Sequence, residues 1–257
     1  MKVAILAGGF GTRLGEETEL RPKPMVEIGG RPIILHIMDH YRRYGHRDFH
    51  IALGYRGEYI KRYMMQFSNL EGDLSIDFES GDIVRRGHQP IDWRVHLHET
   101  GGLTLTGGRI LRMKPHLSGE TFMLTWGDGL SDVDLDALMD FHRSHGRLAT
   151  VTAVRPPARF GHLEIATDGR ITEFSEKPQA AEGWINGAFF VLEPGIFDYL
   201  QMRQDEMWEH GPMRKLASDG QLMAYQHEGF WQCMDTRRDR QILEDLWANG
   251  QAPWRER

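Results

Sequence analysis

A glycine-rich segment directly after the first apolar run carries the residues best suited to chemistry, and it runs Leu6-Ala7-Gly8-Gly9-Phe10-Gly11-Thr12-Arg13. Gly8, Gly9 and Gly11 allow positive φ angles and a close approach of the backbone to a ligand. Successive exposed N–H groups in such a turn form a concavity that binds anions. Arg13 adds a guanidinium, which binds phosphate oxygens through two parallel hydrogen bonds. The segment predicts a phosphate-binding loop.

A second cationic cluster, Arg21-Pro22-Lys23-Pro24, follows this loop, and its two prolines hold it extended. Three interpretations are open: an ordinary strand-to-helix turn with solvated charges, a dinucleotide-binding turn, or a triphosphate cradle. The dinucleotide pattern needs a glycine where Leu14 stands and does not call for Arg and Lys in the turn. A P-loop would end in Gly-Lys-Ser/Thr, which is missing. Only a triphosphate cradle outside the P-loop class uses every unusual residue.

Asp128 has the position expected of a metal ligand. It follows the apolar run 122–125, within Trp126-Gly127-Asp128-Gly129. Parallel α/β sheets bind ligands beyond the C-terminal ends of their strands, and Mg²⁺ prefers carboxylates together with substrate phosphates. The alternative is an ordinary turn residue between two glycines. The position at a strand end favours the metal ligand.

Two histidines, His96 and His98, alternate along a strand-like segment and therefore project from the same face. Such a pair could bind a metal. No third His, Cys or carboxylate is spaced in the sequence to complete a site. We therefore interpret both as surface histidines.

Apolar periodicity predicts the elements that would position these residues. Short apolar runs predict strands, and apolar residues three and four positions apart predict helices. We expect strands at 3–6, 49–53, 122–125, 149–154 and 188–192, helices at 33–44, 55–67, 134–145 and 239–247, and a hairpin at 163–174 around Asp168-Gly169. This alternation predicts an α/β protein with a doubly wound, mainly parallel sheet and helices on both faces.

The domain organisation follows from composition along the chain. The segment 71–94 is polar, with three glycines and weak periodicity, so we expect a loop or lid there rather than core. No linker is rich enough in Pro, Gly or Ser to demand two independent domains. We expect one domain over 1–257, whose smaller second portion, from about 147, is rich in β-structure.

Composition also restricts the partners. The 257-residue chain has 31 Lys+Arg against 37 Asp+Glu, a net charge of −6, which argues against nucleic acid as the main partner. Cys233 is the single cysteine, so the chain forms no internal disulfide and no cysteine-rich zinc site. No apolar run approaches a membrane span, and the N-terminus has the pattern of a core strand rather than a signal peptide. We expect a soluble, cytoplasmic protein with no membrane partner.

Several separated motifs resemble the sugar-1-phosphate nucleotidyltransferase family. The glycine-rich segment 7–14 is followed by Pro22-Lys23-Pro24-Met25-Val26-Glu27-Ile28-Gly29-Gly30-Arg31-Pro32-Ile33. The branch that it resembles most is that of the glucose-1-phosphate cytidylyltransferases. The motifs that carry this closer resemblance are Glu16-Glu17-Thr18, Thr106-Gly107-Gly108-Arg109, the segment 126–129, Gly229-Phe230-Trp231 and Met234-Asp235-Thr236.

The resemblance, which extends from Met1 to Trp254, implies a Rossmann-like fold of the nucleotide-diphospho-sugar transferase type. Its nucleotide-binding portion would be about 1–146 and its sugar-phosphate-binding portion about 147–257. The implied reaction is that of CTP with α-D-glucose 1-phosphate to give CDP-glucose and pyrophosphate, with Mg²⁺ as cofactor. The sugar phosphate, with a second pKa near ~6, would attack the α-phosphorus in line without a general base. Positioning and charge neutralisation would then supply the catalysis.

The resemblance also implies roles for individual residues. Arg13 would interact with the departing pyrophosphate. Lys23 would neutralise the charge of the α-phosphate and of the sugar phosphate, and Asp128 and Asp235 would bind the metal ion. Asp235 has an alternative role as a helix N-cap. The implied nucleotide-binding residues are Leu6, Ala7, Gly8, Gly9, Gly11, Thr12, Arg13, Lys23, Thr104, Arg109 and Gly127. The implied sugar-phosphate-binding residues are Gly161, Glu176, Lys177 and Asn186.

Further implications concern assembly and pathway. Relatives are commonly homo-oligomers, and CDP-glucose would be a precursor of deoxysugars in lipopolysaccharide O-antigen. Another nucleotide or sugar phosphate would use the same chemistry, and only Glu16-Glu17-Thr18 argues for CTP. A non-catalytic nucleotide-sugar-binding module is disfavoured because the chain keeps both aspartates and its cationic residues. A nicotinamide oxidoreductase is disfavoured by the missing glycine.

Overall fold

A computed structural model of the chain describes residues 1–9, 14–15, 18, 21–67, 73–87, 91–156, 162–165, 171–175, 183–201, 203 and 205–255. Its strands are β1 (Lys2–Ala7), β2 (Glu27–Ile28), β3 (Arg31–Pro32), β4 (Asp48–Leu53), β5 (Asp73–Ile76), β6 (Ile83–Arg86), β7 (Arg94–Glu99), β8 (Phe122–Trp126), β9 (Gly129–Ser131), β10 (Ala149–Val154), β11 (His162–Ile165), β12 (Ile171–Ser175), β13 (Ile185–Leu192), β14 (Leu222–His227) and β15 (Trp231–Cys233). Its helices are η2 (Lys23–Met25), α2 (Ile33–Arg43), α3 (Gly57–Phe67), α4 (Thr106–Arg112), α5 (Lys114–Leu117), α6 (Leu135–His145), η3 (Pro194–Tyr199), α7 (Pro212–Ser218) and α8 (Arg237–Ala248).

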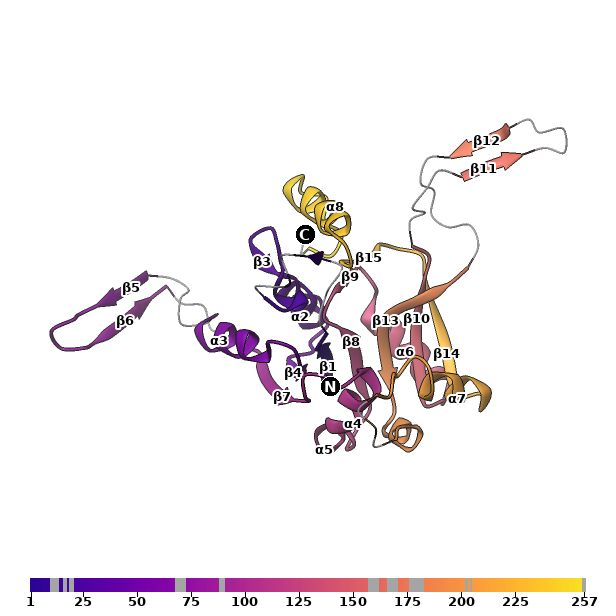
Figure 1. Ribbon diagram of the computed structural model, residues 1–257, viewed down its shortest axis with the longest axis horizontal. Coiled ribbons are helices and arrows are strands. Elements are labelled where there is room, and N and C mark those ends of the chain that lie inside the picture. Colours follow the sequence, from indigo (N-terminus) through magenta and orange to yellow (C-terminus); the bar gives the residue numbers. More distant parts are fainter. Residues whose placement is uncertain are drawn as a thin grey trace.

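Seven strands form the central sheet, in the order β14-β10-β13-β8-β1-β4-β7 (Figure 1). Strand β1 runs parallel to β8 and β4, and β4 runs parallel to β7. Strand β13 is antiparallel to both β8 and β10, and β10 is parallel to β14. Six strands therefore share one direction and β13 alone runs against them, which confirms the mainly parallel α/β sheet.

Two hydrophobic cores cover the two faces of this sheet, and β1 contributes to both. Val3 and Ile5 pack into the core formed with α2, α3, α6 and α8, whereas Ala4 and Leu6 pack into the core formed with α4, α5, η3 and α7. Successive side chains of a strand point to opposite faces. A strand buried on both faces is therefore apolar throughout, which explains the continuous apolar run of β1.

Helices α2, α3, α6 and α8 begin and end close to their expected positions, whereas α4, α5 and α7 were not predicted. Helix α6 starts after Asp134, whose side chain accepts a hydrogen bond from the N–H of Ala137, and ends at Gly146, which has a φ of 63°. Helices α3 and α8 each start two residues away from the expected positions. None of the described helices is long and apolar enough to span a membrane.

Two hairpins project from the body in opposite directions (Figure 1). Strands β5 and β6 pair within 71–94, and β7 begins at Arg94. The prediction of a loop there is therefore wrong, because the backbone groups of β5 and β6 pair as an antiparallel ladder. The described side chains of these two strands are exposed, as expected of a segment outside the core. Strands β11 and β12 pair as the second hairpin, which confirms that prediction. The turn at Asp168-Gly169 lies outside the described residues.

Candidate active site

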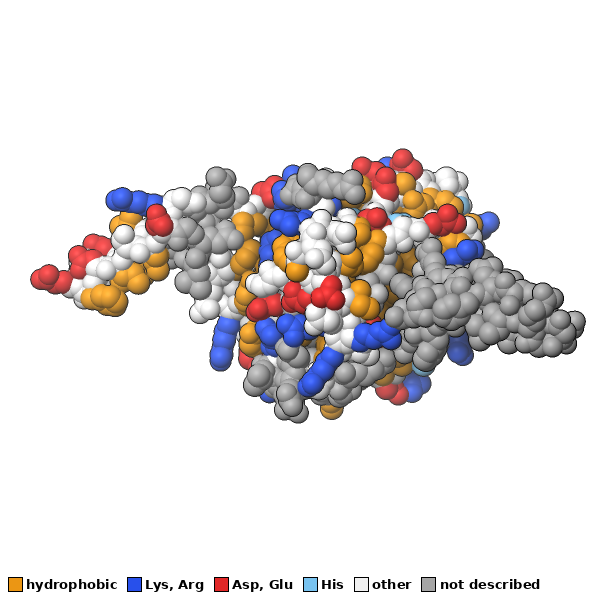
Figure 2. Space-filling view, turned by 90° about the horizontal axis from the view of Figure 1, so that it is seen from above, with side chains coloured by type: hydrophobic (Ala, Val, Ile, Leu, Met, Phe, Trp, Pro, Cys, Tyr) orange, Lys and Arg blue, Asp and Glu red, His pale blue; other side chains and the backbone are white. Residues whose placement is uncertain are grey.

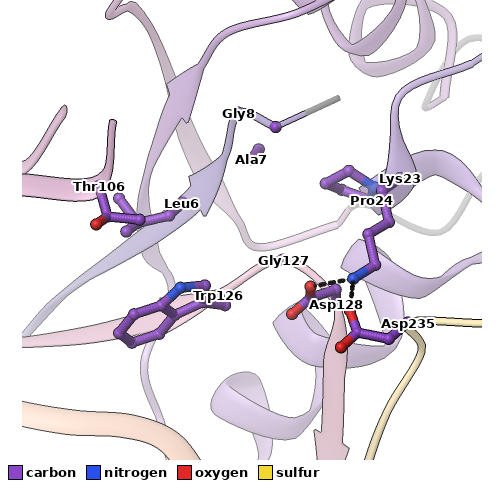
Figure 3. A pocket seen from close by; sticks show the side chains of 11 residues that line it. Leu6, Ala7, Gly8, Lys23, Pro24, Thr106, Trp126, Gly127, Asp128 and Asp235 are labelled. Atoms are coloured by element: carbon purple, nitrogen blue, oxygen red, sulfur yellow. Dashed lines mark hydrogen bonds and ion pairs between the residues drawn. The ribbon is translucent and has the colours of Figure 1, made fainter. Parts of the chain in front are cut away.

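A cavity of about 230 Å³ opens where β1 and β8 end, and it brings together most of the described residues predicted to bind nucleotide (Figure 3). Its lining residues are Leu6, Ala7, Gly8, Gly9, Lys23, Pro24, Thr106, Trp126, Gly127, Asp128 and Asp235. Strands β1 and β8 are parallel neighbours, so their C-terminal ends meet at one edge of the sheet. This is the edge where such sheets bind ligands.

Gly127, which follows β8, holds the end of that strand against the end of β1 by a hydrogen bond. Its N–H donates to the carbonyl oxygen of Leu6 at 3.0 Å. A Cβ atom at this position would lie 3.0 Å from Cγ of Pro24 and 3.2 Å from the Leu6 oxygen. The absence of a side chain therefore lets the segment before Asp128 pack closely against both neighbours.

Lys23 lies between the two predicted metal ligands, Asp128 and Asp235 (Figure 3). Its Nζ is 2.5 Å from Oδ2 of Asp128 and 2.5 Å from Oδ1 of Asp235. Burial alone would lower the pKa of the Lys23 ammonium, but the charges and hydrogen bonds of the two carboxylates outweigh burial and raise the pKa above its ordinary value. Lys23 is therefore charged at neutral pH, and the two carboxylates share one cation.

A short two-stranded ladder brings Asp128 and Asp235 together across more than one hundred residues of sequence. Strand β9 follows Asp128 and pairs antiparallel with β15, which precedes Asp235. The N–H of Met234 extends this ladder by donating to the carbonyl oxygen of Asp128 at 2.8 Å. Antiparallel pairing places the start of β9 beside the end of β15, so the two aspartates lie at the same end.

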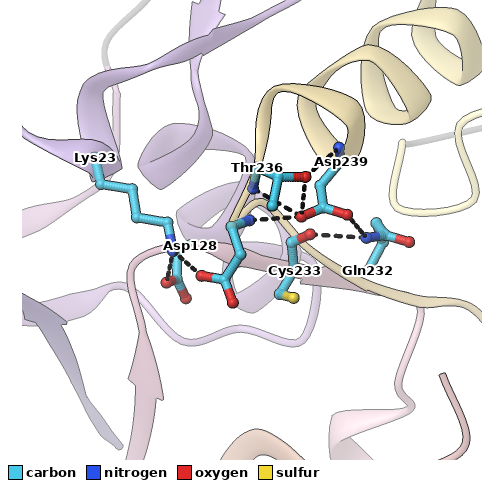
Figure 4. Close-up of polar contacts among 7 residues, drawn as sticks. Lys23, Asp128, Gln232, Cys233, Thr236 and Asp239 are labelled. Atoms are coloured by element: carbon cyan, nitrogen blue, oxygen red, sulfur yellow. Dashed lines mark hydrogen bonds and ion pairs between the residues drawn. The ribbon is translucent and has the colours of Figure 1, made fainter. Parts of the chain in front are cut away.

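The turn after Asp235 is held by a capping box at the start of α8 (Figure 4). Thr236 is the N-cap, and its hydroxyl accepts from the N–H of Asp239 at 3.2 Å. Oδ2 of Asp239 in turn accepts from the N–H groups of Thr236 and Asp235, at 2.8 and 3.0 Å. The alternative role of Asp235 as the helix N-cap is therefore wrong, and its carboxylate meets Lys23 instead.

Cys233, which precedes this turn, is a free thiol with little reactivity. Burial and the nearby aspartate charges raise the pKa of its thiol to about 12. The thiolate is the nucleophilic form of cysteine, so Cys233 offers no nucleophile to the cavity at neutral pH.

Arg109 lies beneath the glycine-rich loop rather than in the lining of the cavity. It is buried, and its guanidinium donates to the Leu53 carbonyl oxygen at 2.8 Å and to Oγ1 of Thr100 at 2.7 Å. Burial lowers its pKa. A Cβ atom at Gly8 would lie 2.2 Å from its Cζ. Arg109 therefore supports the backbone of the loop from below, and Thr104 is likewise buried outside the lining.

Of the four residues predicted to bind the sugar phosphate, the structure describes Asn186. Its Oδ1 accepts from the N–H of Ala188 at 2.8 Å, and Ala188 has a φ of 64°. The indole N–H of Trp231 donates to the Gly187 carbonyl oxygen at 2.8 Å, which ties this bend of β13 to β15. Asn186 is not in the cavity lining. The predicted site residues outside the described residues are Gly11, Thr12, Arg13, Gly161, Glu176 and Lys177.

Three lining residues were not predicted: Pro24, Thr106 and Trp126. Each stands within a motif that carried the family resemblance, which is the signal that could have found them. The hydroxyl of Thr106 donates to Oε2 of Glu209 at 2.7 Å and accepts from the N–H of Trp208 at 2.9 Å. These bonds fix the start of α4 at the side of the cavity.

His96 is at the surface as interpreted, with a side chain that is 42% exposed, but the expectation that no further ligand lies near it is wrong. One ring nitrogen of His96, one ring nitrogen of His50 and one carboxylate oxygen of Asp48 all lie within 4.8 Å of one another. His50 is buried, and burial and the neighbouring His96 lower its pKa to about 4. The sequence spacing hid this group because β4 and β7 become neighbours only in the sheet.

Residues 2–236 match the model of the nucleotidyl transferase family. The chain belongs to this family. Within the family, it is 45% identical over 256 residues to glucose-1-phosphate cytidylyltransferase from Salmonella typhimurium, with 99% of each chain covered. It is 43% identical over 255 residues to the probable glucose-1-phosphate cytidylyltransferase of Bacillus subtilis, again with 99% of each covered. The family resemblance found in the motifs is confirmed.

A solved structure shares the architecture of this chain. The crystal structure of HddC from Yersinia pseudotuberculosis, complexed with GMP-PN, superposes with a TM-score of 0.69 at 21% identity. The match covers 96% of this chain and 99% of that chain. The family fold therefore extends over nearly the whole molecule.

Proposed function

We propose that this protein is an enzyme that transfers the cytidylyl group of CTP to α-D-glucose 1-phosphate, giving CDP-glucose and pyrophosphate. The observation that carries the proposal is the placement of Lys23 between Asp128 and Asp235 in a cavity at the ends of β1 and β8. Identity of 45% along the full length to a cytidylyltransferase of glucose 1-phosphate supports the choice of substrates.

Charge neutralisation is the main task of this site, because two anions must meet and a third must leave. The backbone N–H groups of Gly8 and Gly9 would bind the nucleotide phosphates. The Lys23 ammonium would exchange its carboxylates for oxygens of the α-phosphate and of the sugar phosphate. Arg13 would stabilise the charge that develops on pyrophosphate. The sugar phosphate attacks the α-phosphorus, the bond to pyrophosphate breaks, and no proton needs to be removed.

The donor set fits a magnesium ion. Asp128 and Asp235 present carboxylate oxygens around a point that a cation, the Lys23 ammonium, already shares. Hard oxygen ligands of this kind suit Mg²⁺, which keeps waters and substrate phosphates as its other ligands. When bound, Mg²⁺ would neutralise phosphate charge at the reacting centre. The residues that hold it would be Asp128 and Asp235.

The remaining contacts divide along the chain. Within residues 1–146, the nucleotide would be positioned directly or through the loop backbone by Leu6, Ala7, Thr104, Arg109 and Gly127. Within residues 147–257, Lys177 would bind the sugar phosphate. Gly161, Glu176 and Asn186 would contact the sugar hydroxyls, because backbone, carboxylate and amide groups distinguish hydroxyl positions through hydrogen bonds.

Pyrophosphate release tests the reaction and the base in one experiment. The enzyme is assayed with Mg²⁺, glucose 1-phosphate and each of CTP, UTP, dTTP, GTP and ATP in turn. We expect CTP to be preferred by more than tenfold in kcat/KM, about 1.4 kcal/mol of differential transition-state binding. Release with another nucleotide would retain the mechanism and change the substrate. No release with any of them would contradict the proposal.

We also propose that the protein forms homo-oligomers in the cytoplasm. The β5–β6 hairpin carries exposed apolar side chains far from the body (Figure 2). Phe78 is 92% exposed, and its neighbours Leu74, Ile76, Ile83 and Val84 are also exposed. Apolar side chains gathered on a projecting hairpin suit a protein interface, and a second copy of this chain is the partner that we propose. A cytoplasmic location agrees with the free Cys233.

A further inference from the structure

A histidine-rich cluster lies on the edge of the central sheet, away from the active-site cavity. Asp48 and His50 come from the start of β4, and His96 and His98 from β7, the edge strand. In the parallel register, His50 stands opposite His96. The cavity lies beyond the last residues of β1, whereas Asp48 stands opposite Lys2, the first residue of β1. The two groups therefore occupy opposite ends of the strands.

Three atoms of this cluster converge. Nε2 of His96 is 3.2 Å and Nε2 of His50 is 3.6 Å from Oδ1 of Asp48. Ligand atoms placed about 2.1 Å from a tetrahedral metal ion lie roughly 3.4 Å from one another. The two measured separations bracket this value. The rings of His50 and His96 are nearly parallel, with centroids 4.5 Å apart, so the half-exposed His96 ring would turn to direct its nitrogen at the same ion as His50.

Two buried polar atoms in this cluster lack the hydrogen bonds that burial demands. Oδ1 of Asp48 and Nε2 of His50 are both shielded from solvent, and neither forms a well-aligned hydrogen bond among the described residues, although Nε2 of His96 lies 3.2 Å from Oδ1. The His50 side chain is 4% exposed. Buried polar groups in native proteins are almost always satisfied by a partner. A bound cation would satisfy both atoms at once.

The surroundings orient the histidines for metal binding. Nδ1 of His50 lies 2.9 Å from Nε2 of His98, and the His98 ring packs on the ring of His116 with centroids 4.3 Å apart. A metal-bound histidine usually engages its other ring nitrogen in such a hydrogen bond, which fixes the tautomer and the ring. With Nδ1 engaged, His50 has Nε2 left for a ligand.

Two cationic side chains lie near the cluster. Nη1 of Arg94 is 3.6 Å from Oδ2 of Asp48, the oxygen that does not face the histidines, and the Arg94 side chain is 73% exposed. Lys2 donates to the carbonyl oxygen of His116 at 2.8 Å and pairs with Glu120. Neither cation pairs with Oδ1 of Asp48 in these contacts. Oδ1 therefore still faces the imidazoles of His50 and His96.

We propose that Asp48, His50 and His96 form a binding site for a divalent transition-metal ion of the zinc class. Two imidazoles and one carboxylate are the ligands such ions favour, with water completing the coordination. A bound ion would join the edge strand β7 to β4 through side chains. This site is independent of the proposed nucleotidyl transfer, since it shares no residue with the cavity.

Zinc binding to the metal-free protein tests the proposal. The protein is titrated with Zn²⁺ by calorimetry in the presence of excess Mg²⁺, and thermal unfolding is followed with and without Zn²⁺. We expect one equivalent to bind and to raise the unfolding midpoint by several degrees. Co²⁺ in place of Zn²⁺ should give visible absorption bands typical of low-coordinate cobalt.

Variants separate this site from others. His96→Ala alters a half-exposed side chain, so the protein should fold, and Zn²⁺ affinity should fall by at least ~100-fold. His98→Ala should weaken binding by roughly 10- to 100-fold. The matched control His210→Ala changes an exposed histidine elsewhere and should bind as the wild type. Asp128→Asn should bind equally, which separates the site from the carboxylates of the cavity.

The proposal would be overturned by Zn²⁺ binding and a thermal shift that persist unchanged in His96→Ala, or by an absence of binding in the wild-type protein. Loss of binding in Asp128→Asn but not in His96→Ala would also reject it, because the ion would then occupy the active-site carboxylates. Circular dichroism of each variant establishes that a loss does not come from unfolding.

Discussion

The ammonium of Lys23 separates two carboxylates that would otherwise repel each other. Its side chain is 13% exposed, against 25% for Asp128 and 32% for Asp235. Partial burial strengthens each attraction, because less water screens the charges. A group whose pKa is higher in the folded than in the unfolded state stabilises the folded protein. That stabilisation is complete below the pKa of the unfolded state and is lost as the pH rises through the pKa of the folded state. Lys23 should therefore stabilise the site throughout the neutral range.

Replacing this cation gives a first prediction. Lys23→Met should lower the free energy of unfolding by about 1–3 kcal/mol, since it leaves two partly buried carboxylates facing each other. Urea unfolding measures the change, which should be constant between about pH 6 and 9. Millimolar Mg²⁺ should recover part of the loss by replacing the missing charge. In this background, Asp128→Asn should be stabilising, and a further destabilisation would contradict the account.

A second prediction concerns the metal ligand. Asp128→Asn should lower kcat by roughly 10²–10³, the usual cost of removing one electrostatic contact to a transition state. The KM for glucose 1-phosphate should change little. Pyrophosphate release over a range of Mg²⁺ concentrations measures both. Asp140→Asn is the matched control, because its side chain is 79% exposed on α6 and it loses the same charge. Unchanged turnover in Asp128→Asn would remove this residue from the metal site.

At the scale of elements, the loop after β1 depends on the absence of a side chain at Gly8. A methyl group there would meet the buried Arg109 guanidinium, which is already held by Leu53 and Thr100. At the neighbouring Gly9, no atom of the described residues lies within 4 Å of the position of a Cβ atom. Two adjacent glycines of one loop therefore have different constraints.

This difference gives a third prediction, which concerns stability. Gly8→Ala should lower the free energy of unfolding by about 1–3 kcal/mol, the usual cost of overpacking, because Arg109 or the loop must shift. Gly9→Ala should leave stability unchanged within about 0.5 kcal/mol. Urea unfolding of both variants measures the contrast. If both variants were equally destabilised, a clash with Arg109 would not be the reason that a glycine is needed at position 8.

The capping box of α8 gives a fourth prediction. Thr236→Ala should cost about 1 kcal/mol, because the N–H of Asp239 loses its partner at the start of the helix. It should also lower kcat several-fold, since the same turn holds Asp235 beside Lys23. Unfolding and pyrophosphate release measure the two effects. Thr236→Ser keeps the hydroxyl and should restore both, whereas failure of Ser to restore them would exclude capping as the cause.

At the scale of the whole molecule, the projecting β5–β6 hairpin exposes apolar side chains that the monomer does not bury (Figure 2). A fifth prediction follows from the proposed homo-oligomer. Phe78→Asp combined with Ile83→Asp should shift the protein toward the monomer in sedimentation velocity. Met65→Asp, an apolar-to-charged change on α3 at a residue that is 72% exposed, should have no effect. An unchanged oligomer in the double variant would place the interface elsewhere.

The architecture was predictable from local sequence patterns. Runs such as Val3 to Leu6 are apolar on both faces because helices cover both faces of the sheet, so local patterning reports the α/β fold. The glycine-rich loop and Asp128 were also recognisable as candidate site residues because each follows a strand, and Lys23 because its charge stands between two prolines. The hairpin at 73–86 was missed, since exposed strands carry no apolar periodicity.

The order and register of the strands bring distant residues together. The pairing of β9 with β15 brings Asp235 to Asp128, and the parallel register of β4 and β7 brings His50 to His96. Neither contact has a signal in sequence spacing, because strand order and register arise from packing of the whole sheet. Burial also places Arg109 outside the cavity lining, and Thr236 caps α8 in place of Asp235. Patterns along the chain report local structure, whereas contacts between its distant segments require the fold.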